Sequence, residues 1–322
     1  MRILGIESSA HTFGAGVWDG RRVAANEKAF YKPKKGGIHP RKAADFLAEN
    51  AGGILREAVG KCGMRLADFD AFAFTVGPGL GPCLQVGAAM AKTLAGRFGK
   101  PLIPVNHCVA HIEITRHFTK MRDPVIVYVS GGNTQIIVRE KAGYRVLGET
   151  LDIGLGNLLD SFGRAMGLEW AHGSVIEGLA RKGRYVPLPY TVKGMDLAFT
   201  GLLTHAEKML AGHPKEDVCY SLQETAFAML CEAAERAVAM AGKREVAACG
   251  GVAQNSRLQE MLRVMCRERG ARFAVGPDEF NADNGAMIAY AGALMLGAGM
   301  RFSAKDAKVR QRFRVDEVEA RW

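Results

Sequence analysis

The feature that most constrains the fold of this chain is a strand-turn-strand pattern that occurs twice. In the first copy, apolar runs at 3–6 and 13–18 flank the small and polar segment ESSAHT at 7–12. In the second copy, VIVYV at 125–129 leads into SGGNT at 130–134, and the chain returns through QIIV at 135–138. Each copy is typical of a β-hairpin with a small, polar tip. The two copies begin at residues 3 and 125. A pattern that repeats at such a separation indicates a duplicated domain.

Two such hairpins could hold one phosphate chain between two lobes. Glycine and small hydroxyl residues let backbone N–H groups approach an anion closely. A nucleotide would then lie where the two tips meet. Two ordinary hairpins in a mixed sheet would show the same spacing, so the repeat alone leaves both interpretations open.

The rest of the pattern predicts an α/β protein, for which 322 residues provide two domains or one large body. Further strands are predicted at 71–76, 102–105, 245–249 and 272–275, and helices at 84–98, from 106 onward, and at 157–167, 175–183, 217–242, 256–269 and 284–296. Helices that alternate with strands in the second half are typical of this class. We expect the chain to divide into residues 1–120 and 121–322.

Composition bears on partners and compartment. The 43 Lys and Arg against 33 Asp and Glu give a net charge of +10, which favours a polyanionic partner, although a solvated surface explains it as well. The seven cysteines form no C-x-x-C pair, as expected for reduced thiols in a cytoplasm. The uncharged stretches 71–91 and 284–300 are interrupted by Gly and Pro or are short, so they indicate buried core rather than membrane spans. The start carries too short an apolar run for a signal peptide, and we expect a soluble cytoplasmic protein with no membrane partner.

A histidine pair is the first candidate for a metal site. His107 and His111 lie one turn apart at the start of a predicted helix, so both imidazoles project from one face. A zinc protease of the H-E-x-x-H kind needs Glu after the first His, and Cys108 stands there instead. Asp283, at a loop-to-helix junction, either caps the helix or ligates a cation. The phenol of Tyr128 either belongs to the core or reaches a metal or nucleotide at the hairpin tip.

Two other segments could contact a nucleotide or nucleic acid. The segment CGGVAQN at 249–255 follows a predicted strand and opens a helix, where paired glycines let a base or sugar lie against the backbone. A simple tight turn explains it equally well, and the pattern is not the dinucleotide-binding G-x-G-x-x-G. A basic loop that carries Lys32, Lys34 and Lys35, with Arg41 close behind, could contact phosphates.

Together these segments resemble the archaeal and eukaryotic branch of the universal tRNA threonylcarbamoyladenosine synthesis family, the catalytic subunit of the KEOPS complex. The matching segments span the chain from its first strand almost to its end. They are GIE at 5–7, AHT at 10–12, KGGIHP at 35–40, GPGLGP at 77–82, NHCVAH at 106–111, YVSGGNTQ at 128–135, GETLDIG at 148–154, GLLT at 201–204, GGVA at 250–253 and DNGA at 283–286.

The resemblance implies a duplicated actin and sugar-kinase-like fold (ASKHA), with two lobes and a nucleotide cleft between them. The first lobe, 1–120, would carry the metal-ligand helix, and the second, 121–322, the nucleotide site. The implied reaction moves a threonylcarbamoyl group from threonylcarbamoyl-AMP to N6 of the adenosine 3′ of the anticodon, in tRNAs that read ANN codons. No Ser or Cys nucleophile is required, and we name no catalytic side chain.

The resemblance also implies the site residues and partners. Metal ligands map onto His107, His111, Tyr128 and Asp283, for one divalent ion per subunit, with iron favoured over zinc. Nucleotide contacts, to threonylcarbamoyl-AMP or ATP, map onto Tyr128, Val129, Ser130, Gly131, Gly132, Asp160, Gly173, Glu177 and Asn255. The implied partners are tRNA, a small kinase-like ATPase that some relatives carry fused at the C-terminus, and a dimerising subunit.

Two other functions remain open on the sequence. An ATP-dependent kinase or a bare ATPase of the same fold would use the hairpins but gives no role to the histidine pair. A non-enzymatic nucleic-acid-binding scaffold would explain the positive charge but not the histidines and Asp283.

Overall fold

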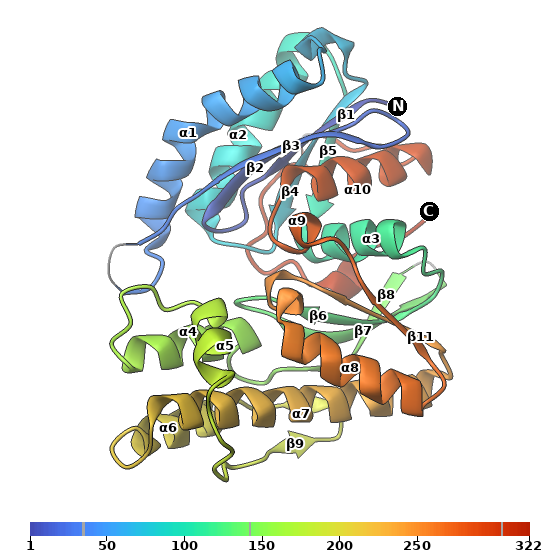
Figure 1. Cartoon of the computed structure of the whole chain (residues 1–322). Helices are drawn as coiled ribbons and strands as arrows, with labels where there is room; N and C mark the ends of the chain where they lie inside the picture. Colours follow the sequence, from blue (N-terminus) through green and yellow to red (C-terminus); the bar gives the residue numbers. More distant parts are fainter. Residues whose placement is uncertain (34–35, 142, 304) are drawn as a thin grey trace.

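The structure, a computed structural model, describes residues 1–33, 36–141, 143–303 and 305–322. Two five-stranded sheets form the centres of two lobes, and helices cover their faces (Figure 1). Lys34 and Lys35, two residues of the basic loop, lie outside the described residues.

The first sheet contains the first hairpin. Its strands β1 (Ile3–Glu7), β2 (Thr12–Trp18), β3 (Val23–Phe30), β4 (Ala71–Gly77) and β5 (Leu102–Asn106) lie in the order β3-β2-β1-β4-β5. Strands β1 and β2 are antiparallel, with Glu7 opposite Gly14, whereas β1 and β4 are parallel. Helices α1 (Pro40–Lys61) and α2 (Gly81–Phe98) bury their apolar faces in the core formed with Phe13, Phe72 and Phe74.

The second sheet contains the second hairpin. Its strands β6 (Val125–Val129), β7 (Thr134–Glu140), β8 (Gly143–Glu149), β11 (Glu245–Cys249) and β12 (Arg272–Val275) lie in the order β12-β11-β6-β7-β8. The pair β6 and β7 is antiparallel, with Tyr128 opposite Gln135. Its core includes residues of α4 (Leu155–Ala165), α5 (Gly173–Ala180), α6 (Thr200–Met209), α7 (Lys215–Ala241) and α8 (Ser256–Glu268). The short strands β9 (Val192–Lys193) and β10 (Asp196–Leu197) form a separate pair.

The last long helix returns to the first sheet. Helix α10 (Gly285–Gly297) packs on β1 and β2, and two glycines of the first hairpin make this approach possible. A Cβ at Gly5 would lie 2.2 Å from the Ala289 nitrogen, and one at Gly16 would lie 2.1 Å from the Ala286 nitrogen. The contact fixes Asp283, two residues before the helix, beside the first lobe. Residues 121–322 therefore do not all stay with the second sheet.

Two further segments contact both lobes. Helix α3 (His107–Thr119) contacts β4 and β5 of the first sheet, β6, β11 and β12 of the second, and α10. The C-terminal tail, residues 305–322, runs from the first lobe to the second and contains η3 (Val315–Glu317). The remaining short elements are η1 (Leu66–Asp68), η2 (Gly251–Gln254) and α9 (Asp278–Asn281).

Every strand and helix predicted from the sequence is present, with ends shifted by up to a few residues. The longer elements that were not predicted are β3, α1, β8 and α6, and the short elements β9, β10, α9, η1, η2 and η3 were not predicted either. The largest omission is α1, whose buried stripe consists mostly of alanine, so its apolar periodicity is weak. Among the described residues, no helix has the length and apolar character to cross a membrane. All seven cysteines are free thiols.

Candidate metal centre and nucleotide site

The junction between β5 and α3 places both histidines between the lobes. The Asn106 side chain caps the helix by accepting the Val109 N–H at 3.1 Å, and its amide donates to the Phe313 carbonyl of the tail at 3.1 Å. His107 is the first residue of the helix and His111 lies one turn later. Both imidazoles are buried, with ring centroids 4.7 Å apart.

Asp283 completes a three-residue cluster with these histidines. Its Oδ1 lies 3.3 Å from His111 Nε2 and 3.5 Å from His107 Nε2. One donor atom from each of the three residues lies within 4.8 Å of the others. Two imidazole nitrogens and a carboxylate converge from segments far apart in the sequence, because docking of α10 brings Asp283 to α3. The structure brings three of the predicted metal ligands together, and their binding of a metal stays a prediction.

The electrostatics of the cluster favour a bound cation. Burial opposes charge on His107, but the carboxylates of Glu7 and Asp283 outweigh it and raise the pKa of His107 to about 9. Burial lowers the pKa of His111. Burial also opposes charge on Asp283, yet the two histidines hold the pKa of its carboxyl well below its usual value. A metal would replace the proton that His107 carries between two carboxylates.

Tyr128 lies next to this cluster on β6. Its ring centroid is 5.6 Å from that of His111, and the residue is fully buried. Its hydroxyl has no hydrogen-bond partner among the described residues, and neither has Nδ1 of His111. Burial raises the pKa of the Tyr128 phenol well above its usual value. A buried hydroxyl without a partner is costly, and a metal or ligand at the cluster would satisfy it.

Glu7 is a functional candidate that the sequence analysis did not single out. Its buried carboxylate receives three contacts: the Ser9 N–H at 2.5 Å, the Thr75 hydroxyl at 2.6 Å, and His107 Nδ1 at 3.0 Å. A carboxylate on the far nitrogen of a metal-binding histidine fixes its tautomer and ring orientation. The available signal was a lone carboxylate ending an otherwise apolar strand, where charged groups are rarely buried without a role.

The tip of the second hairpin offers backbone donors. The Ser130 N–H donates to the Asn133 carbonyl at 2.8 Å, which closes the turn. The N–H groups of Gly131 and Gly132 donate to no described residue, and both glycines are exposed. The carbonyls of Ser130 and Gly131 accept from the first turn of α4 at 3.1 and 3.0 Å, so the tip is held in place. Two adjacent free N–H groups can bind a phosphate.

The other predicted nucleotide residues gather on the second lobe. Burial raises the pKa of Asp160 on α4, and the backbone of Gly173 at the start of α5 opposes this shift. Glu177, one turn further along α5, accepts the Ser256 N–H at 3.1 Å, which links it to α8. The Asn255 side chain caps α8 and donates to Gln223 at 3.0 Å, and its backbone N–H donates to the Val252 carbonyl at 3.0 Å, so this residue is held firmly at the start of the helix. Val129, which ends β6, is fully buried.

The donor set fits a divalent transition metal. Two imidazoles, a carboxylate and a nearby phenol suit iron, zinc and manganese, whereas calcium and magnesium prefer oxygen ligands alone. Gly250, at the end of β11, packs so closely on β6 that a Cβ there would lie 3.3 Å from the Tyr128 ring. Tyr128 therefore connects the cluster to both the hairpin tip and the segment before Asn255.

Sequence comparisons agree along the whole chain. The family model described as "tRNA N6-adenosine threonylcarbamoyltransferase" matches residues 21–290. A protein of that name from Thermococcus kodakarensis is 51% identical over 100% of both chains. A "probable bifunctional tRNA threonylcarbamoyladenosine biosynthesis protein" from Methanocorpusculum labreanum is also 51% identical, over 100% of this chain and 61% of that protein.

Two solved structures share the fold. The T. kodakarensis protein HypF superposes with a TM-score of 0.67 at 15% sequence identity, covering 95% of this chain and 49% of HypF. Component A of the Acidaminococcus fermentans (R)-2-hydroxyglutaryl-CoA dehydratase gives a TM-score of 0.58 at 15% identity, covering 90% and 96% of the two chains. At this identity the likeness concerns the fold alone. The predicted duplicated actin and sugar-kinase-like α/β fold is confirmed.

Proposed function

The chain belongs to the tRNA N6-adenosine threonylcarbamoyltransferase family, and from that premise we propose that its transfer reaction takes place at one divalent metal held by His107, His111 and Asp283, with Tyr128 as a further ligand. The chain is a transferase that acts on tRNA, and the modified product is threonylcarbamoyladenosine. The observation that carries the proposal is the convergence of three donor atoms within 4.8 Å, between the two lobes of a nucleotide-binding type of fold.

The chemistry requires polarisation of the carbamoyl carbon and a leaving group that carries charge away. The N6 amine attacks that carbon and an N–C bond forms. The C–O bond to the phosphate of threonylcarbamoyl-AMP breaks, so AMP leaves with the electron pair and N6 loses a proton. A metal bound at the cluster supplies a Lewis acid for the developing negative charge. Iron is our first choice and zinc the second.

The residues around the cluster prepare it for this chemistry. Glu7 holds the His107 ring so that Nε2 faces Asp283, 3.5 Å away. The N–H groups of Gly131 and Gly132 bind the phosphate that leaves, where fixed donors stabilise charge without rearrangement. Asp160 and Glu177 accept hydrogen bonds from the ribose hydroxyls. Direct attack by the adenine amine needs no covalent intermediate on the protein.

The acceptor we propose is the adenosine 3′ of the anticodon in tRNAs that read ANN codons. The relatives support a proposal about partner proteins. Some of them are described as bifunctional biosynthesis proteins, and this chain spans only 61% of one of them. We propose a KEOPS-type assembly with a small kinase-like ATPase and a dimerising subunit. The exposed Lys32 of the basic loop and the exposed Arg41 at the start of α1 contribute to tRNA binding through phosphate contacts, which weaken as salt rises.

The test is transfer of label to RNA. The metal-loaded chain, assembled with partner subunits from its own organism, is incubated with threonylcarbamoyl-AMP labelled in the threonine and with unmodified tRNA. We expect label on the tRNA, and none on a tRNA that carries guanosine at the target position. Conversion of ATP to ADP by this chain without its partner subunits, with no labelled tRNA from the complex, would support a kinase or ATPase instead. Binding of tRNA without either reaction would support a scaffold.

A further inference from the structure

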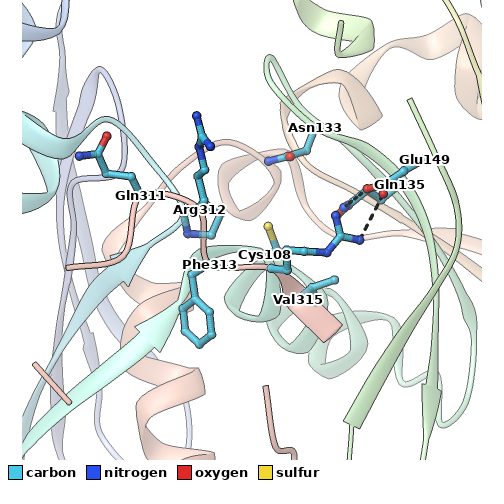
Figure 2. A pocket seen from close by; sticks show the side chains of 10 residues that line it. Cys108, Asn133, Gln135, Glu149, Gln311, Arg312, Phe313 and Val315 are labelled. Atoms are coloured by element: carbon cyan, nitrogen blue, oxygen red, sulfur yellow. Dashed lines mark hydrogen bonds and ion pairs between the residues drawn. The ribbon is translucent and has the colours of Figure 1, made fainter. Parts of the chain in front are cut away.

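A pocket of about 250 Å³ lies on the C-terminal tail, apart from the predicted nucleotide residues on the second lobe (Figure 2). We name it the tail pocket. Its walls are Pro78 after β4, Gln311 and Arg312 of the tail, and Asn133 and Gln135 of the second hairpin, while Cys108 of α3 lies at its base. We propose that the tail pocket binds the acceptor adenine of tRNA, an inference that rests on the proposed transfer function.

Hydrogen bonds fix the tail as one wall of this pocket. The Arg310 N–H donates to the Val76 carbonyl at 2.7 Å, and the Gly79 N–H donates to the Gln311 carbonyl at 3.2 Å. Further along, the Arg314 guanidinium lies 3.2 Å from the Glu149 carboxylate of the second lobe. The tail is therefore attached to both lobes.

The polar lining of the pocket is dominated by side-chain amides. Asn133 and Gln311 make no side-chain hydrogen bond to any described residue. Gln135 donates to Glu149 at 2.9 Å, which leaves its oxygen available. An amide offers a donor and an acceptor side by side, and it pairs with the N6–H and ring nitrogen of adenine. Figure 2 shows the Asn133 amide across the pocket from Gln311 and Arg312.

Arg312 supplies a free cation at the same place. Its neighbours in the tail are engaged, since Arg310 pairs with Glu317 and Arg314 pairs with Glu149 and Asp316. Arg312 is exposed and forms no ion pair with the part of the chain that the structure describes. A free guanidinium at the rim of a pocket can bind an RNA phosphate or stack on a base.

The size and position of the pocket fit a single base. Its volume of about 250 Å³ is below the roughly 300–1,000 Å³ of pockets that hold drug-sized ligands, so a whole nucleotide would not be enclosed. Enzymes that modify a base take it out of its stack and into such a pocket. Cys108 at the base follows His107 directly, and Asn133 closes the hairpin that presents Gly131 and Gly132. An adenine held here would approach the cluster from the tail side.

The threonyl carboxylate of the donor is the competing occupant, because it could pair with Arg312. The side-chain amides of the pocket favour the base, because a carboxylate would use only their N–H donors and leave their oxygens unpaired. Measurements on the full assembled complex separate the two. Arg312→Gln should raise the KM for tRNA about tenfold and leave the affinity for the donor nucleotide within twofold of wild type. The matched control is Arg301→Gln, an exposed arginine whose side chain hydrogen-bonds to the Met300 carbonyl and to no other described residue, and its KM for tRNA should stay within twofold of wild type.

A binding experiment tests recognition of adenine directly and requires no turnover. Two anticodon stem-loops compete for the complex, one with adenosine at the target position and one with purine riboside, which lacks the N6 amine. Wild type should prefer adenosine about fivefold or more, and Gln311→Leu should lose most of this preference. Asn133→Leu should have the same effect from the opposite wall.

The proposal is overturned in either of two ways. Weaker binding of the donor nucleotide by Arg312→Gln, with an unchanged KM for tRNA, would assign the pocket to the threonyl group. Unchanged discrimination in both leucine variants would mean that the pocket does not read the base. A wild-type complex that transfers no label to tRNA would instead contradict the proposed function, and the competition assay would still report on the pocket.

Discussion

The two hairpins share a strand-turn-strand form but differ in what their tips leave available. In the first, the carboxylate of Glu7 already has three contacts, from Ser9, Thr75 and His107. In the second, the Gly131 and Gly132 N–H groups have no partner among the described residues, and the Tyr128 hydroxyl also has none. The Glu7 carboxylate is satisfied within the protein, although Ser8 Oγ and His11 Nδ1 of the first tip have no partner among the described residues. The second tip leaves two adjacent backbone donors without a partner among those residues.

This difference indicates that the two hairpins of the duplicated fold have different roles. The first hairpin orients a histidine and, through Gly5 and Gly16, docks the helix that positions Asp283. The second hairpin presents free donors that suit a phosphate. The two functions meet where the rings of His111 and Tyr128 lie 5.6 Å apart. Variants on each side should therefore separate metal binding from nucleotide binding.

The largest effect is expected where the hairpins meet. His111→Ala removes a proposed metal ligand, whose ring is buried against both Asp283 and Tyr128. We expect loss of stoichiometric metal, measured by elemental analysis, and a fall in transfer rate of more than about 100-fold, since loss of outer partners alone costs 10–100-fold. His117→Gln on the same helix is the control, because His117 packs against Trp18 and Tyr290 instead. Normal metal content in the purified His111→Ala protein would contradict the ligand assignment.

A smaller effect is expected at the first hairpin. Glu7→Gln keeps the shape of the side chain but removes the charge that orients His107, so metal affinity should fall about 10–100-fold. Nucleotide affinity measured without metal should not change, because the second hairpin provides those contacts. Glu57→Gln, an exposed change on α1 that affects only a surface pair with Lys61, is the control. If Glu7→Gln lowers metal affinity and metal-free nucleotide affinity equally, the two hairpins do not have separate roles.

A change at the second hairpin should have the opposite result, with weaker nucleotide binding and unchanged metal binding. Gly132→Pro removes an N–H that donates to no described residue, whereas Gly132→Ala keeps it in a position where a Cβ meets open space. A hydrogen bond to a charged group contributes about 1.5–3 kcal/mol, so the proline variant should bind nucleotide about tenfold more weakly or worse. Metal content should stay stoichiometric in both variants. If calorimetry finds the same nucleotide affinity for the alanine and proline variants, this N–H does not bind the phosphate.

The smallest effect concerns a contact between the lobes. Lys32 of the first lobe lies over the Trp170 ring of the second at 4.0 Å from its centroid, and Trp170 stacks on His172 just before Gly173. An exposed cation–π contact contributes about 0.5–1 kcal/mol, so Lys32→Met should speed nucleotide release about two- to fivefold. Lys32→Arg preserves the contact and serves as the control. Identical release rates for the methionine and arginine variants, measured by stopped flow, would show that the contact does not affect the nucleotide.

Local patterns were sufficient to predict the hairpins, the strands of both sheets other than β3 and β8, and the histidine pair, because each depends on residues close in sequence. The contact between Glu7 and His107 depends on how β1, β4 and β5 are ordered in the sheet, and no local pattern encodes it. Asp283 was ambiguous for the same reason: only the docking of α10 on the first hairpin separates a cap from a ligand. The tail has no regular periodicity, so its path between the lobes and its pocket could not be predicted.

The most direct test of the account is the coupling between metal and nucleotide. If the two hairpins meet at one metal, the affinity for a non-hydrolysable ATP analogue, measured by calorimetry, should be higher with metal than without it. Asp283→Asn removes a negative ligand but keeps the size, and the neighbouring Asn284 still caps α10. The variant should melt near wild type in the metal-free state, keep its metal-free affinity for the analogue, and lose most of the gain with metal. A variant that keeps the full gain would contradict a shared site and return Asp283 to a structural role.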